Sequence, residues 1–257
     1  MLDVAEIEIS EFCNSFLEGK ARIRMLEAGC GSASRLKLKA AVDAVGIDIS
    51  CDQLVRNTTV QEKILADIQD YPLPRNAFDV AVCWWVLEHL ARPHDALTNL
   101  FGSLKQEGLL ILVFPNLLSL KGMATKFAPF WFHKLYYRLM KWKSHPFRTY
   151  LRRDILPKNL IRFAQQNGFS PVYFSLTEAD TIIRRARNSS QLVNLAYLAV
   201  ASILKAVSFG RLDSLSLECC AMILKKQGMS FPIPDQYTDE IGVSGAIGSR
   251  ETCPDPM

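Results

Sequence analysis

Short apolar runs alternate with amphipathic segments along the first half of the chain. Residues 4–17 and 93–105 have the apolar spacing of helices, and Pro93 suits a first helical turn. The intervening apolar runs have the length of buried strands, at residues 23–28, 44–49, 64–66, 78–85 and 108–114. This alternation predicts an α/β fold, with a mostly parallel sheet covered by helices on both faces.

The regular alternation of predicted strands and helices stops after Pro115. Residues 155–166 return to a helical pattern that Gly168 ends, and residues 169–176 and 215–224 have the pattern of two further strands. We therefore predict a single domain over residues 1–227. Its parts are a core at 22–115, a basic aromatic lid insertion at 116–153, and an apolar helical insertion at 177–214; residues 228–257, rich in Pro, Gly, Ser and Asp, are predicted to be a disordered tail.

Positive charge is concentrated in the lid insertion. Residues 116–153 contain nine Lys and Arg and no acidic residue, so this segment is +9 while the rest of the chain sums to −5. A concentrated basic block indicates an anionic partner more strongly than a uniform net charge of +4 does.

Cysteine usage and hydropathy indicate a cytoplasmic protein. The seven cysteines are scattered without a C-x-x-C pair, which is typical of reduced thiols and offers no zinc site. Acidic residues precede the first apolar run, unlike in a signal peptide. The most apolar stretch, residues 192–204, is shorter than the roughly twenty residues needed to cross a bilayer.

The candidate chemistry lies where three consecutive predicted strands end. Gly29-Cys30-Gly31 follows the first strand, and the glycines allow a tight turn and close approach to a ligand. Asp48 ends the second strand, where a carboxylate can accept hydrogen bonds from both hydroxyls of a ribose. Asp67-Ile68 follows the third and could bind the amine and face of an adenine. The carboxyl ends of the strands form the ligand crevice of such sheets, so the three motifs together predict a nucleoside-containing cofactor.

These motifs resemble those of class I S-adenosylmethionine-dependent methyltransferases, of methyltransferase type 11 and the ubiquinone-biosynthesis subgroup. The resemblance rests on residues 26–31, 45–50, 66–68 and 78–90, and on 104–109, where Gln106-Glu107 replaces the usual Pro-Gly. It implies a Rossmann-like, seven-stranded fold with S-adenosyl-L-methionine as cofactor. It also implies cofactor-binding residues: Glu27, Gly29, Cys30 and Gly31 beside the methionine part, Asp48 and Ile49 at the ribose, Asp67 and Ile68 at the adenine, and Cys83 and Trp84 lining the cleft.

Two histidines are candidate catalytic residues. A general base assists methyl transfer to a hydroxyl, and His89 follows the fourth strand near the transfer site. His133 lies in the lid insertion, which could bring it over the cleft. The structural alternatives are a helix-start pair Glu88-His89 that organises a loop, and a surface position for His133. No metal ligand set is expected.

The acceptor must be inferred from the two insertions. Interleaved aromatic and basic residues at 116–153 suit an anionic membrane surface, an anionic substrate or single-stranded nucleic acid, or else a helix whose aromatics pack on the core. The helix at 191–209, with Arg184, Arg185 and Arg187 before it, favours lipid among these partners, and a buried core helix or an oligomer interface stays open as the alternative. Nucleic acid is disfavoured, because Cys83-Trp84-Trp85 lacks the Asp or Asn, Pro-Pro and aromatic pattern of amine-methylating nucleic-acid enzymes.

We therefore predict a cytoplasmic methyltransferase, in contact with membranes, that acts on a lipid-like or sugar-containing small molecule, at oxygen rather than carbon or nitrogen. Two alternatives stay open. A nicotinamide-dependent oxidoreductase would need a third glycine where Ser34 stands, and it would leave Asp67 without a role. A non-catalytic protein that binds the cofactor would keep the same motifs. The acceptor and the oligomeric state do not follow from the sequence.

Overall fold

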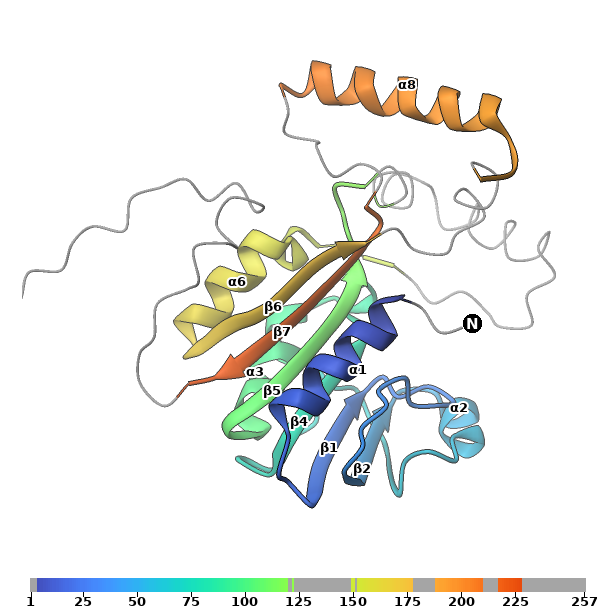
Figure 1. The fold of residues 1–257 in the computed structure, drawn as a ribbon. Helices are drawn as coiled ribbons and strands as arrows, with labels where there is room; N and C mark the ends of the chain where they lie inside the picture. Colours follow the sequence, from blue (N-terminus) through green and yellow to red (C-terminus); the bar gives the residue numbers. More distant parts are fainter. Residues whose placement is uncertain are drawn as a thin grey trace, which may run out of the picture.

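The computed structural model describes residues 4–119, 122, 149–150, 152–177, 188–209 and 217–227. Seven strands form one sheet in the order β3-β2-β1-β4-β5-β7-β6. The first five strands pair in parallel, whereas β7 runs antiparallel to both β5 and β6 (Figure 1). The predicted Rossmann-like α/β fold with a mostly parallel seven-stranded sheet is confirmed.

The strands at the centre of the sheet, β4, β5 and β7, are mostly apolar and buried, as expected of strands that have helices on both faces. The central strand β4 is buried along its whole length. The strands are β1 (Arg22–Ala28), β2 (Ala41–Asp48), β3 (Glu62–Leu65), β4 (Phe78–Trp84), β5 (Leu104–Pro115), β6 (Phe169–Thr177) and β7 (Cys219–Lys226).

Two hydrophobic clusters lie on opposite faces of this sheet. On one face, Ile9, Cys13 and Leu17 from and just after α1 (Val4–Phe16) pack with Leu54 of α2 (Cys51–Arg56). On the other face lie α3 (Pro93–Ser103) and α6 (Pro157–Gln166), with short 3-10 turns at η1 (Leu87–His89) and η2 (Arg153–Ile155) (Figure 1). The carboxyl ends of the parallel strands are left open between these helices, which positions the candidate site.

Several predicted boundaries move by a few residues. β5 begins at Leu104, not at residue 108, because Leu104 pairs with Phe78 before the register shifts. Lys105 therefore belongs to a strand rather than to the preceding helix. Trp85 lies beyond β4, and Thr177 is still part of β6. The predicted strand at 215–224 corresponds to β7, which begins at Cys219, so residues 217 and 218 are not part of it. Residues 228–257, the predicted tail, lie outside the described part of the chain.

The irregularity near the start of β5, where the register shifts, shows what the Gln106-Glu107 substitution changes. Glu107 has φ of 63°, a left-handed conformation that glycine adopts without strain. Its carboxylate pairs with Lys225 of β7, which stands opposite Leu109 of β5. The backbone there therefore keeps the shape that glycine would allow, and Glu107 adds an ion pair between neighbouring strands.

Asp79 joins three segments at the amino end of the sheet. Its two carboxylate oxygens accept hydrogen bonds from Lys20 and Lys105, each 2.9 Å long, and from the Arg24 amide at 3.0 Å. Burial by itself would raise the pKa of Asp79, but these hydrogen bonds outweigh it and lower the pKa from 3.8 to about 2. The folded state therefore favours the charged form, and this stabilisation is present above about pH 4 and lost as the pH falls toward 2.

We expect Asp79→Asn to lower the free energy of unfolding at pH 7 by about 1–3 kcal/mol, because three donors lose a charged acceptor. Urea unfolding at pH 7 and pH 3 measures this, and the difference from wild type should shrink at the lower pH. Asp43→Asn is the matched control, since Asp43 lies 3.9 Å from Arg24 with both side chains nearly half exposed. Equal losses for the two variants would contradict the role given to Asp79.

None of the residues of helix α8 (Gln191–Val207) is buried, and most of them are exposed. Its N-cap is Ser190, whose hydroxyl accepts a hydrogen bond from the Val193 amide. The predicted helix at 191–209 is thus present and ends two residues early, and the alternative of a buried core helix does not hold. Among the described residues, no helix is both long and apolar enough to cross a membrane.

Candidate functional site

The glycine loop after β1 is built by two residues in left-handed conformations. Gly29 has φ of 66° and Gly31 has φ of 54°. The Gly29 amide donates to the Ile47 carbonyl at 2.7 Å, which ties the loop to the end of β2. A Cβ at Gly29 would lie only 2.2 Å from a methyl carbon of Val86, so glycine is required here for space as well as for conformation.

Two polar side chains hold this loop in place. Asp48, at the end of β2, accepts hydrogen bonds from the Gly31 amide at 2.9 Å and the Ser50 amide at 2.8 Å. Asn57, fully buried after α2, donates to the carbonyls of Cys30 at 3.2 Å and Gly31 at 3.0 Å. The loop is therefore preorganised by hydrogen bonds rather than by regular secondary structure.

Glu27 is a buried carboxylate on the floor of the site. Its Oε1 accepts a 2.6 Å hydrogen bond from the Ser34 hydroxyl, whereas its buried Oε2 has no hydrogen-bond partner. Burial raises the pKa of Glu27, and the hydrogen bonds from Ser34 and the Arg35 amide and the charges of Lys37 and Arg35 act in the opposite direction. A buried acceptor without a donor is costly, so this atom is suited to a ligand that brings one.

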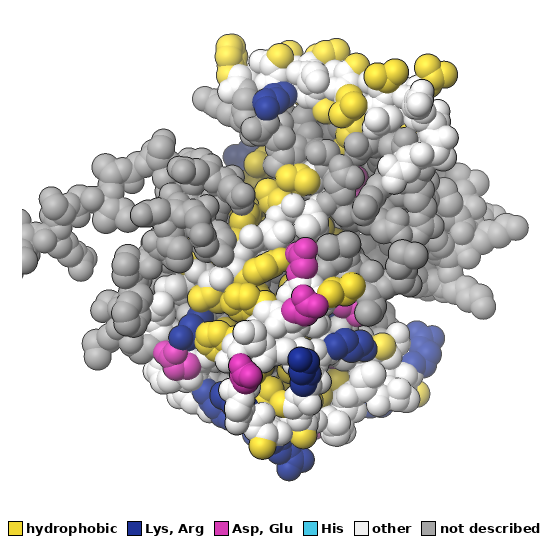
Figure 2. Space-filling view, viewed as in Figure 1, with side chains coloured by type: hydrophobic (Ala, Val, Ile, Leu, Met, Phe, Trp, Pro, Cys, Tyr) yellow, Lys and Arg dark blue, Asp and Glu magenta, His cyan; other side chains and the backbone are white. Residues whose placement is uncertain are grey.

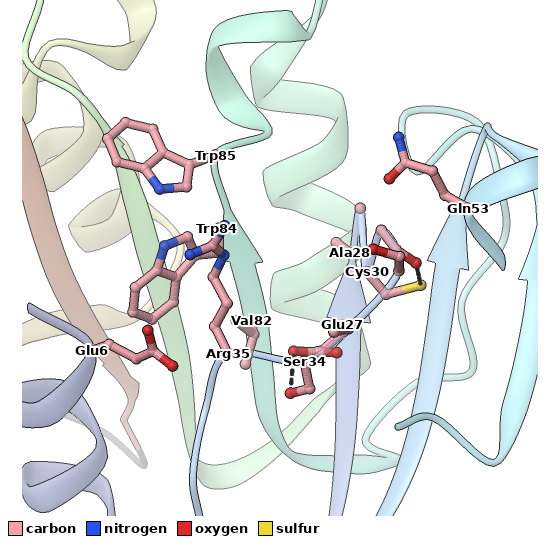
Figure 3. A pocket seen from close by; sticks show the side chains of 14 residues that line it. Glu6, Glu27, Ala28, Cys30, Ser34, Arg35, Gln53, Val82, Trp84 and Trp85 are labelled. Carbon is pink, nitrogen blue, oxygen red and sulfur yellow. Dashed lines mark hydrogen bonds between the residues drawn. The ribbon is translucent and has the colours of Figure 1, made fainter. Parts of the chain in front are cut away.

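Two adjoining cavities open at the carboxyl ends of the strands. The first, of about 440 Å³, lies between the glycine loop, α1 and the end of β4, and Figure 3 shows the side chains that line it. The second, of about 360 Å³, lies over the ends of β2 and β3. Gly29, Gln53 and Trp85 line both cavities, so the two adjoin and together offer a cleft of a size that fits a nucleoside cofactor.

Trp85 stands at the junction of the two cavities in a strained conformation. Its φ is 57°, which is rare for a bulky residue, and its amide donates to the Val113 carbonyl at 2.7 Å. Residues held in such conformations cluster at functional sites, because the surrounding structure must hold them there.

The second cavity gathers the residues predicted for the nucleoside. Asp48, Ile49, Asp67 and Ile68 all line it. Both carboxylate oxygens of Asp67 accept hydrogen bonds from the Gln69 side-chain amide, at 3.0 and 2.9 Å. The motifs at the ends of β2 and β3 thus come together, as the parallel topology predicts.

His89 lines the same cavity, on the short turn η1 after β4. Its Nε2 lies 3.9 Å from a carboxylate oxygen of the buried Glu88. The Glu88 carbonyl accepts a 2.8 Å hydrogen bond from the amide of Tyr150, which also lines the cavity. Tyr150 of the basic aromatic segment therefore reaches the cleft, while the other candidate base, His133, lies outside the described residues.

The expectation for Cys83 needs correction. Its side chain is fully buried in the core and lines neither cavity, whereas Trp84 lines the first cavity. Cys30 and Gly31 line the first cavity as well. Sequence reasoning missed Glu6, Arg35, Gln53, Asn57, Trp85 and Tyr150, because they reach the site from elements whose local patterns carry no motif.

Comparison with known proteins identifies the domain. Residues 26–112 match a family described as a methyltransferase domain. An uncharacterized protein of Methanocaldococcus jannaschii is 35% identical over 109 residues, which cover 42% of this chain and 48% of that protein, so the match spans about half of this relative's length. A ubiquinone biosynthesis O-methyltransferase of Glaesserella parasuis is 24% identical over 172 residues, 62% of this chain and 70% of that protein.

A solved structure, an S-adenosylmethionine-dependent methyltransferase from Archaeoglobus fulgidus, shares the fold with a TM-score of 0.52 at 16% identity, covering 88% of this chain and 95% of that one. The fold and cleft define a Rossmann-like domain for a nucleoside cofactor. More narrowly, residues 26–112 match the methyltransferase-domain family, and the chain resembles S-adenosylmethionine-dependent methyltransferases, which implies S-adenosyl-L-methionine as the cofactor. The unpartnered Glu27 Oε2 and the close-fitting Gly29 loop fit that cofactor.

Proposed function

We propose that this protein transfers a methyl group from S-adenosylmethionine to an oxygen of a lipid-like or sugar-containing small molecule. The observation that carries the proposal is the pair of adjoining cavities, the first lined by the glycine loop and the second by Asp48 and Asp67. The similarity to a ubiquinone biosynthesis O-methyltransferase supports oxygen as the acceptor atom.

In this proposal the bound cofactor supplies a methyl group already activated by its sulfonium. The chain holds that group in place: Asp48 binds the ribose hydroxyls, Asp67 and Ile68 hold the adenine, and the Gly29 loop and Glu27 hold the methionine part. His89 accepts the proton of an acceptor hydroxyl, with Glu88 beside its ring to favour the charged form. His133 stays the second candidate base.

The acceptor class can be tested by methyl transfer from radiolabelled S-adenosylmethionine to separate pools of lipids, glycans, proteins and nucleic acids. Label in a lipid or glycan pool, stable to conditions that cleave methyl esters, would support an ether-forming oxygen methyltransferase. Label only in protein or nucleic acid would overturn the acceptor class. Cofactor binding with no transfer to any pool would favour the non-catalytic alternative.

We also propose that the protein contacts a membrane surface through α8, and the exposed face of this helix supports that contact. Leu192, Leu195, Ile203 and Val207 share one side of the helix and are 62–80% exposed. The less exposed side is mixed, with Asn194, Tyr197 and Ser208 beside Ala201 and Leu204, whereas the outward side is apolar (Figure 2). The described residues 188–209 include Lys205 and no acid, which suits an anionic bilayer.

We expect the double variant Leu195→Ser and Ile203→Ser to bind phosphatidylserine-containing vesicles at least about tenfold more weakly than wild type, because two aliphatic side chains leave the bilayer. Vesicle co-sedimentation measures this. Val55→Ser is the matched control, since Val55 is 72% exposed on α2. Vesicle binding that the double variant leaves unchanged would refute the membrane role of α8. A wild-type dimer that the double variant dissociates would show that α8 instead contacts a second copy of the chain.

A further inference from the structure

Three charged side chains gather around the first cavity without pairing with one another. Glu6 of α1 is 8% exposed, and the carboxylate forms no hydrogen bond or ion pair with a described residue. Glu27 has its unpartnered Oε2 on the floor. Arg35 lines the same cavity, and its guanidinium likewise has no hydrogen bond or ion pair with a described residue, although its charge lowers the pKa of Glu27. Figure 3 shows Arg35 extending from its loop toward Trp84, with Glu6 on the other side of that indole.

The loop that carries Arg35 is held in place by Ser34, the residue just before it. Ser34 donates its hydroxyl to Glu27 at 2.6 Å and its amide to the Thr59 hydroxyl at 2.8 Å. The backbone just before Arg35 is therefore bound to parts of the site. Such anchoring reduces the conformational freedom that Arg35 would lose on binding a ligand.

The same loop is joined to α1 on the other side of Arg35. The Lys37 amide donates to the Ser10 hydroxyl at 3.2 Å, and that hydroxyl donates to the Glu6 carbonyl at 2.6 Å. Asn14 pairs with the loop twice, donating to the Lys37 carbonyl at 2.9 Å and accepting from the Lys39 amide at 2.7 Å. Glu6 and Arg35 therefore belong to one connected unit, although 28 positions separate them in the sequence.

Two carboxylates and one guanidinium around a single cavity suit a ligand that carries both an ammonium and a carboxylate. The cationic end would meet Glu6 and Glu27, and the anionic end would meet Arg35, which can bind a carboxylate with two parallel hydrogen bonds. The reverse orientation would place carboxylate against carboxylate in a partly buried cavity, which is strongly unfavourable. The charges therefore select both the ligand class and its direction.

We propose that Arg35 binds the carboxylate, and Glu6 the ammonium, of the methionine part of the cofactor, so that α1 and the loop after Gly31 select the intact amino acid. This inference rests on the proposed function, since it assigns new residues to the same site. It gives α1 a role in ligand recognition in addition to its packing on the sheet. It also predicts that the cavity discriminates against analogues that lack the amino acid.

The test compares S-adenosylhomocysteine with 5′-methylthioadenosine, which lacks the amino acid, by calorimetric titration of wild type, Arg35→Gln and Glu6→Gln. We expect each variant to bind S-adenosylhomocysteine about tenfold to a hundredfold more weakly, because a hydrogen bond to a charged group is lost. Binding of 5′-methylthioadenosine should change by less than about threefold, since it reaches neither side chain. Lys39→Gln, a basic and exposed position in the same loop, is the matched control and should leave both affinities unchanged.

The outcomes separate this inference from the proposed function. A wild-type protein that binds neither nucleoside would overturn the proposed function and the inference with it. Wild-type binding that Arg35→Gln leaves unchanged, or weakens equally for both ligands, would overturn the inference alone. Thermal unfolding of each variant checks that Glu6→Gln acts at the cavity, because a loss caused by displaced α1 would lower stability and affect both ligands.

Discussion

Replacing Asp48 with alanine abolishes measurable binding of S-adenosylhomocysteine, with an expected loss of at least about a hundredfold in affinity. Asp48 has two roles. Its carboxylate is the acceptor available for the ribose hydroxyls in the second cavity, and it already holds the Gly31 amide at 2.9 Å and the Ser50 amide at 2.8 Å. Alanine removes both the ligand contact and the hydrogen bond that shapes the glycine loop.

Titration of Asp48→Ala, Asp48→Asn and Asp52→Ala beside wild type tests this expectation. Asparagine keeps one oxygen acceptor, so we expect it to retain part of the affinity. Asp52 lies exposed at the start of α2, four residues away, and its replacement should leave binding unchanged. If a folded Asp48→Ala protein binds S-adenosylhomocysteine as tightly as wild type does, the ribose does not bind at this end of β2.

Replacing Gly29 with alanine is expected to lower the free energy of unfolding by about 2–4 kcal/mol, from left-handed strain and overpacking together, and to eliminate cofactor binding. The new Cβ would stand 2.2 Å from a methyl carbon of Val86, so either the loop or the start of η1 must move. Because Gly29 lines both cavities, any such movement displaces the two halves of the cleft relative to each other.

Chemical unfolding and titration measure both effects. Gly102→Ala is the control, since Gly102 lies within α3 with nothing within 4 Å of a new Cβ, and its replacement should be neutral or stabilise the protein by up to about 1 kcal/mol. Adding Val86→Ala to Gly29→Ala relieves the contact but not the strain at φ of 66°, so recovery should be partial. Full stability in the single variant would show that the loop adapts without cost.

The sequence by itself determined the sheet and the cofactor-binding end of the site. Strands buried on both faces must be continuous apolar runs, and polar residues then mark the points where the chain leaves the sheet. Gly29, Gly31, Asp48 and Asp67 could be recognised for that reason, because each lies at the end of a strand or within three residues of it, and parallel strands bring their carboxyl ends to one edge. Predicted strand boundaries were wrong where pairing with a neighbouring strand extends a strand beyond its apolar run. Leu104 is an example, because it joins β5 through its pairing with Phe78 of β4.

The tertiary structure alone decided which other side chains reach the cleft. Glu6 arrives on a helix packed on the sheet, Arg35 on a loop without regular structure, and Asn57 from beyond α2, and no local period marks any of them. It also corrected Cys83, whose side chain enters the core while Trp85 turns into the cleft through its left-handed φ. The outward face of α8 was equally undetermined, since an apolar helical pattern specifies a preferred face but not whether protein or solvent lies against it.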